Sequence, residues 1–179
     1  LGASDPAGAR AALADTAAPG LPPALAEERA LTEARALARG GSVAEAALRY
    51  RDAGAEVAPE FAEFLAAQRD WAGAAAVLGA HLAVALPARP AALDEAQQRL
   101  VGRHAALLAL AGEDGALAAL RQAESPRMAG GAMGDVFALL TAGRLDGVAD
   151  LPRLRQELEF ARVLPSRLDG LREPAPVAR

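Results

Sequence analysis

The sequence predicts an all-α chain of about seven to nine helices with no sheet. Alanine fills 50 of the 179 positions, and alanine and leucine are the strongest helix formers. Isoleucine is absent, and valine and threonine are sparse, so the chain has few of the β-branched residues that favour strands. Gly, Pro and Asp recur between segments of helical apolar spacing, which indicates short links between antiparallel helices.

The pattern divides the chain into a lead-in, a helical domain and a tail. Residues 1–23 are rich in Ala and Pro and predict a flexible linker, because proline repeatedly interrupts any helix there. Residues 24–172 predict a helical-repeat domain, with two regular hairpins over 24–87 and less regular helices and a C-terminal cap over 91–164. The Pro-rich residues 173–179 predict a frayed tail.

The first hairpin is predicted from its stop and start signals. A helix from Ala24 ends at the glycines 40 and 41, and Ser42 with Glu45 has the spacing of a capping box for the second helix. The apolar face of the first helix has helical spacing and consists of Leu25, Leu31, Ala34 and Leu37.

The second hairpin repeats this design. Pro59 opens a helix that carries Phe61 and Leu65, and Asp70 caps the next helix, which continues to the break at Pro87. Further helices are predicted over 91–111, 114–124, 133–142 and 151–164, each bounded by Gly, Pro or Asp. The last of these presents an apolar face that suits a capping helix, formed by Leu151, Leu154, Leu158 and Ala161.

An internal repeat relates the two hairpins, which align without a gap when the chain is shifted by 28 residues. Small residues at equivalent positions let paired helices approach closely, and large apolar residues fill the space between them. The first set, Ala34, Leu37, Ala46, Tyr50, Ala53 and Pro59, aligns with Ala62, Leu65, Ala74, Leu78, His81 and Pro87. A fainter third copy places His104 at the first small position, followed by Leu107, Ala116, Leu120 and Ala123.

This order of small and large residues, closing near a proline, resembles the tetratricopeptide repeat, although that family's period is about 34 residues. The resemblance implies a right-handed solenoid of helical hairpins, with a groove lined by the first helix of each hairpin. Extended peptides or partner helices are held in such grooves. By register, the implied partner-binding residues are Glu28, Leu31, Arg35, Arg39, Glu56, Glu63 and Ala66.

Arg35 and Arg39 stand one helical turn apart in this set. Two guanidinium groups at that spacing could clamp a partner's carboxylate. Charged residues at this spacing are also common on any solvated helix face, which is the alternative interpretation.

Charge and composition narrow the class of partner. The net charge of −4 gives no broad attraction to nucleic acid or to anionic membranes. The uncharged run over 71–88 is mostly Ala and Gly, so we expect a buried helix rather than membrane insertion. Lys, Ile, Asn and Cys are absent and every basic residue is Arg, which indicates a GC-rich bacterial source.

No motif predicts a catalytic, metal or cofactor site. His81 and His104 lie on separate predicted helices, without a histidine one turn away to complete a metal site. Gly130, Gly131 and Gly134 precede an apolar helix, but no strand comes before them and no lysine follows, so a phosphate-binding loop is not supported. Adjacent acids such as those at 27–28 and 113–114 fit helix starts, where they favour the helix dipole.

The sequence therefore predicts a non-catalytic scaffold or adaptor that binds another protein or peptide segment, or associates with itself. The chain begins with Leu1 rather than Met, so we expect that it was trimmed from something longer. Bacterial proteins that resemble this family often serve secretion, flagellar and cell-wall assemblies. The Ala- and Pro-rich lead-in would fit a tether to a membrane anchor or a larger chain, which slightly favours a periplasmic or membrane-tethered location over the cytoplasm. Two alternatives stay open: the helical scaffold of a larger enzyme such as a lytic transglycosylase, and a structural subunit that forms oligomers.

Overall fold

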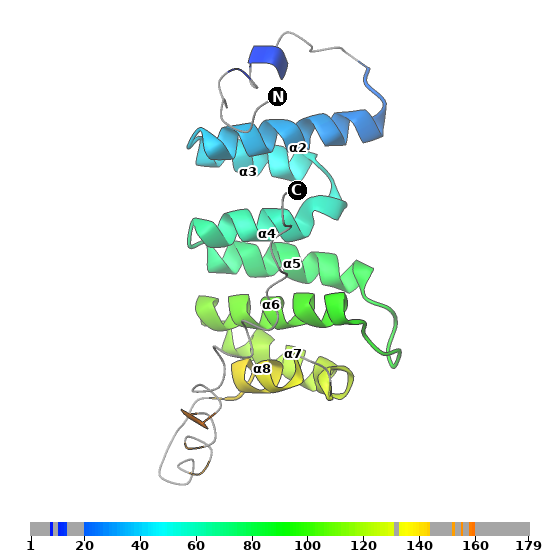
Figure 1. The fold of residues 1–179 in the computed structure, drawn as a ribbon, viewed down its shortest axis with the longest axis vertical. Coiled ribbons are helices and arrows are strands. Elements are labelled where there is room, and N and C mark those ends of the chain that lie inside the picture. The colour runs from blue at the N-terminus through cyan, green and yellow to red at the C-terminus, as the bar shows by residue number, and fades with distance from the viewer. Residues whose placement is uncertain are drawn as a thin grey trace, which may run out of the picture. The chain divides into compact units, whose positions relative to one another are not determined.

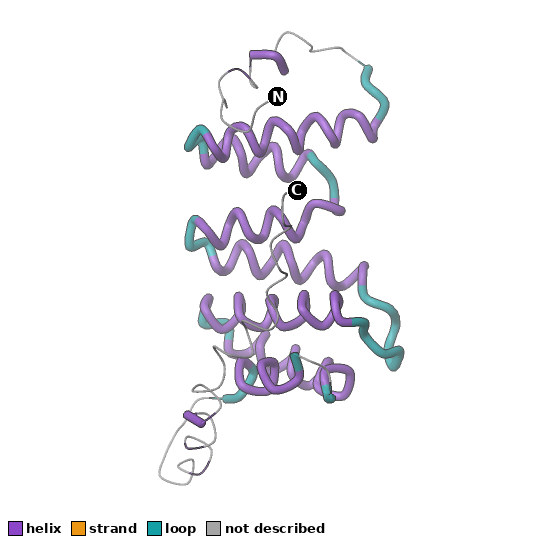
Figure 2. Tube along the Cα trace, viewed as in Figure 1, coloured by secondary structure: helices purple, strands orange, loops and turns teal. Residues whose placement is uncertain are grey.

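The computed structural model describes residues 8, 11–13, 20–130, 133–143, 152, 155, 158 and 159. The chain divides into two compact units, Leu1–Thr141 and Ala142–Arg179, and the architecture below is that of the first. From Pro23 to Leu140 its described residues form seven α-helices and one short 3₁₀-helix, and Figure 2 shows only helices and loops along this part of the trace. The all-α prediction is confirmed.

The first two predicted hairpins are present, with boundaries close to those expected. The first pairs α2 (Pro23–Arg39) with α3 (Val43–Asp52). A 3₁₀-turn, η1 (Ala55–Val57), then leads into the second hairpin, α4 (Ala58–Ala67) and α5 (Trp71–Ala85). Three helices follow: α6 (Glu95–Ala111), α7 (Asp114–Met128) and α8 (Gly134–Leu140).

Within this unit each helix packs mainly against its neighbours in sequence. The pairs α2–α3, α4–α5 and α5–α6 form the broadest contacts, and α8 returns to pack on both α6 and α7. Figure 1 shows α2 to α6 layered one after another, with the links at the helix ends and a longer loop between α5 and α6. Sequential packing of this kind is what short connections between antiparallel helices produce.

The 28-residue register matches the burial of the first two hairpins. The first four aligned pairs are buried in both copies: Ala34 with Ala62, Leu37 with Leu65, Ala46 with Ala74, and Tyr50 with Leu78. Ala34, Ala46 and Ala74 are fully buried, because a methyl group is all that fits where two helix backbones approach closely. The small residues therefore act as predicted.

The third copy departs from this register, so its prediction is only partly right. Leu107 is buried, but Ala116 is exposed and Leu120 and Ala123 are half-buried. α7 instead buries a different face, which contains Leu117, Glu124 and Met128. The reason is that α8 packs on α6 and α7 together, so α7 turns a different stripe inward.

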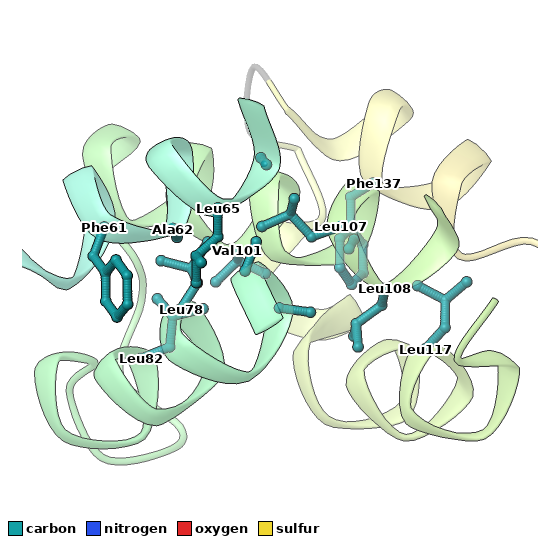
Figure 3. Packing of buried hydrophobic residues seen from close by; sticks show 14 of the residues in the cluster. Phe61, Ala62, Leu65, Leu78, Leu82, Val101, Leu107, Leu108, Leu117 and Phe137 are labelled. Carbon is teal, nitrogen blue, oxygen red and sulfur yellow. The ribbon is translucent and has the colours of Figure 1, made fainter. Parts of the chain in front are cut away.

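A continuous apolar core runs through α4 to α8 and reaches the first hairpin only through Ala34 and Tyr50 among its buried members. Figure 3 shows Leu65, Leu78 and Val101 meeting where α4, α5 and α6 come together, and Phe137 of α8 beside Leu107 and Leu108. α5 and α6 approach so closely that a Cβ at Gly79 would lie 3.0 Å from Nε2 of His104. A larger residue at position 79 would crowd the His104 imidazole, so glycine suits this close approach.

Helix caps follow the sequence signals in part. The Asp70 carboxylate accepts a hydrogen bond from the Gly73 N–H at 2.9 Å, as predicted. The prediction of a capping box at Ser42 and Glu45 is wrong, because the Ser42 side chain makes no cap hydrogen bond. Both N-cap residues have similar backbone angles, with ψ of 67° and 71°, so the longer aspartate reaches the helix amide where the serine hydroxyl does not.

Two later boundaries differ from the prediction. α6 begins at Glu95, four residues later than expected, because Asp94 and Gln97 form a reciprocal capping box. α7 continues to Met128, four residues beyond the predicted end, with Pro126 inside its last turn. Arg127 and Met128 are buried there, so tertiary contacts hold a turn that the proline alone would interrupt.

Other predictions fall mainly outside the described residues. This holds for the capping helix over 151–164, of which only residues 152, 155, 158 and 159 are described, as helix, and for the tail over 173–179. In the lead-in over 1–23, residues 8 and 11–13 are helical. Among the helices in the described part of the chain, none combines the length and apolarity needed to cross a membrane.

Candidate partner-binding face

Ion pairs join the first helices of successive layers. Arg35 of α2 donates to both carboxylate oxygens of Glu60 on α4, from Nε at 2.8 Å and from Nη2 at 2.6 Å. Three residues further along α4, Glu63 accepts a hydrogen bond from Arg103 of α6 at 2.5 Å. Residues three apart share one side of a helix, so α2, α4 and α6 present these pairs on a common side.

Glu60 is the centre of the junction between the first two hairpins. Besides Arg35, it accepts a hydrogen bond from the Tyr50 hydroxyl of α3 at 3.1 Å. The Tyr50 ring stacks on Phe61 at 5.4 Å and meets Phe64 at 5.2 Å, while the Arg51 guanidinium lies 5.9 Å from the Phe61 ring centre. These contacts link α2 and α3 to α4 through one mixed aromatic and ionic cluster.

Protonation states at this junction follow from the same contacts. The hydrogen bonds from Arg35, with a smaller contribution from Tyr50, hold the pKa of Glu60 below its usual value. Burial and the Glu60 hydrogen bond raise the pKa of Tyr50 to about 12, so the hydroxyl stays protonated and donates. The hydrogen bond to Glu60 also raises the pKa of Arg35. At this junction Arg35 and Glu60 are therefore both charged and paired, and Tyr50 is neutral.

The predicted binding residues divide into groups with different surroundings. Glu28, Arg39 and Glu56 are exposed, and their side chains make no ion pair with the described residues. Arg35 and Glu63 are exposed but are held by Glu60 and Arg103. We define the first-helix face by the exposed or half-buried charged residues of this surface: Glu28, Arg35, Arg39, Glu56, Glu60, Glu63 and Arg103.

Leu31 and Ala66 are placed differently from the rest of the predicted set. Ala66 is only 5% exposed and belongs to the apolar core, so it does not line the surface. Leu31 is half-buried and packs against the same core. The register assigned both positions to a groove, but their apolar side chains are drawn inward.

The paired arginines have different roles in the structure. Arg35 already holds a carboxylate within the chain, that of Glu60. Arg39 lies close enough to the same cluster to lower the pKa values of Tyr50 and Glu60, yet forms no ion pair with the described residues. A two-arginine clamp on a partner stays a prediction, with Arg39 as its available member.

Sequence reasoning missed Glu60 and Arg103 as parts of this surface, and it missed the hydrogen bond from the buried Tyr50 to Glu60. Glu60 lies 25 residues from Arg35, and Arg103 lies 40 residues from Glu63, so no helical spacing links the partners. A usable signal was the spacing of Glu56, Glu60 and Glu63, which places three acids on one side of α4 and the turn before it.

The histidines and glycines that the sequence offered as possible metal or phosphate ligands do not come together in the structure. His81 Nδ1 lies 3.2 Å from the Ala55 carbonyl oxygen. His104 packs between α5 and α6, where its Nδ1 is buried and has no hydrogen-bond partner among the described residues. Within the described ranges, no three His, Cys, Asp or Glu side chains gather as a metal site would require. Of the glycine-rich segment, Gly130 has a positive φ of 76° after α7, and Gly131 lies outside the described residues.

Comparisons of this chain with protein-family models, with curated proteins and with solved structures returned no match.

Proposed function

We propose that this chain is a non-catalytic scaffold or adaptor that binds a segment of another protein through the first-helix face. In this proposal the hairpins form a right-handed solenoid resembling tetratricopeptide repeats. The ion pairs from Arg35 to Glu60 and from Glu63 to Arg103 carry the proposal, because they register three first helices into one surface. A surface built from rigid helices holds its side chains in fixed positions for a partner.

Three charged residues of this face have no ion pair with the described part of the chain, and their charges indicate what the bound segment would contain. Glu28, Arg39 and Glu56 carry both signs and are exposed, which suits a polar segment with charges of both signs. Complementary charges of this kind steer binding and select partners more than they add affinity. A surface with both positive and negative charges favours a peptide or helix as the partner over nucleic acid, which would require a basic surface.

The test is charge reversal at one position with a matched control. Arg39→Glu changes a cation on the first-helix face, and Arg121→Glu makes the same change on the exposed side of α7. Partners recovered with the tagged chain from its source cells are quantified by mass spectrometry. We expect Arg39→Glu to reduce one specific partner about tenfold and Arg121→Glu to leave it unchanged. Equal recovery with all three chains would remove the proposal.

Self-association is a second candidate, favoured by the outward side of α5. This helix has no charged residue, and Val84 on it is 87% exposed. Its other exposed residues are alanines, at 72, 76, 80, 83 and 85, which would let a second helix approach closely. Light scattering after size exclusion decides this candidate: a dimer that Val84→Glu converts to a monomer supports it, and a monomeric wild-type chain excludes it.

A further inference from the structure

A cavity of about 410 Å³ lies between the loop joining α5 to α6 and the C-terminal end of α7. This volume falls within the range of small-molecule sites, about 300–1,000 Å³. Most of its lining is apolar, and polar side chains enter at three positions. The apolar walls include Pro90, Leu93, Ala123 and Pro126, and the polar side chains are Arg89, Gln98 and Arg127.

Among the described residues, the charges around this cavity do not balance, because two guanidinium groups share one carboxylate. Glu124 Oε1 accepts hydrogen bonds from Arg89, from Nε at 3.2 Å and from Nη2 at 2.6 Å. Its Oε2 accepts from Arg127 Nη1 at 3.0 Å. Glu124 is nearly completely buried, so this trio leaves one positive charge at the cavity.

The two arginines differ in how many donors they have left. Arg127 is buried, and besides Glu124 it donates to the carbonyl oxygens of Pro87 and Ala91, each at 2.9 Å, which fixes the loop to α7. In its hydrogen bonds with the described residues Arg89 uses only Nε and Nη2, and its side chain is 61% exposed. A guanidinium has five N–H donors, so Arg89 keeps the Nη1 pair for another acceptor while Glu124 holds its orientation.

We propose that this cavity binds an organic carboxylate with a small apolar body, its anionic group on Arg89 and its apolar part against Pro90, Leu93 and Pro126. The cavity favours an anionic ligand over a neutral one, because a bound carboxylate neutralises the excess positive charge of Arg89, Arg127 and Glu124. The apolar lining selects the body. The site uses no residue of the first-helix face, so it does not depend on the proposed scaffold function.

Binding of hexanoate tests the proposal, with hexanamide as the neutral analogue of nearly the same shape. Each is titrated into the full ¹⁵N-labelled chain, and amide shifts are followed by NMR. We expect hexanoate to shift the amides of Leu93, Ala129 and Gly130 saturably, and hexanamide to bind at least about tenfold more weakly. Equal binding of the two compounds contradicts the proposal.

Variants locate the anionic contact. Arg89→Gln should weaken hexanoate binding about tenfold, since it removes the charged donor, while Arg121→Gln on the same helix as Glu124 should not change it. Circular dichroism confirms that each variant folds. Should Arg89→Gln unfold, Ala92→Phe decides, because it fills the cavity from the exposed loop without touching Glu124 and should abolish binding.

A blocked tripeptide, acetyl-Ala-Ala-Leu, with a free or an amidated C-terminus, distinguishes the source of the carboxylate. Tighter binding of the free-acid peptide than of hexanoate supports the C-terminus of a protein partner as the natural ligand. Tighter binding of hexanoate supports a free organic acid. If neither carboxylate shifts the cavity amides, or if Arg89→Gln binds them like the wild-type chain, the proposal is overturned.

Discussion

Glu124 and Arg127 are the two charged residues that the described part of the chain buries. Removing one partner of a buried pair leaves the other charge desolvated, which is strongly destabilising. We therefore expect Glu124→Ala to lower the free energy of unfolding by about 2 kcal/mol or more in urea denaturation. Arg127 would lose its counter-charge, although its bonds to Pro87 and Ala91 moderate the loss.

Glu95→Ala is the matched control for Glu124→Ala. Glu95 pairs with Arg99 at 2.6 Å, but both side chains are at least half exposed. Exposed pairs one turn apart contribute roughly 0.3–0.5 kcal/mol, so this change should have little effect. Equal losses from the two substitutions would show that burial of Glu124 does not matter.

We expect His104 to make the fold sensitive to mild acid. Burial between α5 and α6 lowers its pKa from 6.5, opposed in part by a backbone hydrogen bond with Ala75. α5 has no acidic or basic residue except His81, so no carboxylate on that helix compensates a charge on His104. On α6, the adjacent Arg103 is paired with Glu63. The neutral imidazole is therefore the form that fits this interface.

The unfolded chain binds a proton at His104 more readily than the folded chain does. The stability that His104 confers is thus present above pH 6.5 and is lost as the pH falls through 6.5 towards the lower folded-state pKa. Denaturant titrations across this window should show falling stability for wild type and for His81→Gln. His104→Gln should be nearly independent of pH there, and a slope as steep as that of wild type would contradict this account.

At the scale of single elements, the two helix starts that share a backbone conformation offer a direct comparison. Asp70→Ala removes a cap hydrogen bond at the start of α5 and should cost about 1 kcal/mol in thermal or urea denaturation. Ser42→Ala at the start of α3 should cost less than half of that, because the Ser42 hydroxyl makes no cap hydrogen bond. Similar costs at the two sites would contradict these cap assignments.

Some helices could be predicted from the sequence and others could not. α2 to α5 were predictable because small and large apolar residues repeat at fixed spacing, and burial of each such residue depends mainly on its neighbouring helix. The end of α7 was not, since its last turn depends on contacts of Arg127 with a loop about 40 residues earlier. The first-helix face was predicted in part. Its exposed charges follow from helical spacing, whereas the ion pairs of Glu60 and Arg103 join different helices and depend on the tertiary fold.

At the scale of the whole molecule, the first hairpin depends on one junction. Tyr50 and Ala34 are the buried residues through which α2 and α3 join the main core, and Tyr50 also binds Glu60. Tyr50→Ala removes the ring that stacks on Phe61 and contacts Phe64, and it should cost about 3 kcal/mol. The loss should fall mainly on the first hairpin.

Native-state hydrogen exchange measures this uncoupling. In Tyr50→Ala we expect amides of α2 and α3 to lose protection while those of α5 and α6 keep most of theirs. Leu48→Ala is the control, because Leu48 lies on the same helix but is 57% exposed. A uniform loss of protection over α2 to α8 would instead indicate a single cooperative unit.

The central proposal is that a partner binds the first-helix face, and site-specific photo-crosslinking in the source cells tests it most directly. A photoreactive residue is placed at Glu28, Arg39 or Glu56, which are exposed on this face, and at Ala76 or Ala80 on the outward side of α5. We expect the same protein to be captured from all three face positions and not from α5. Capture from α5 alone, or of a second copy of the chain alone, would contradict the proposal.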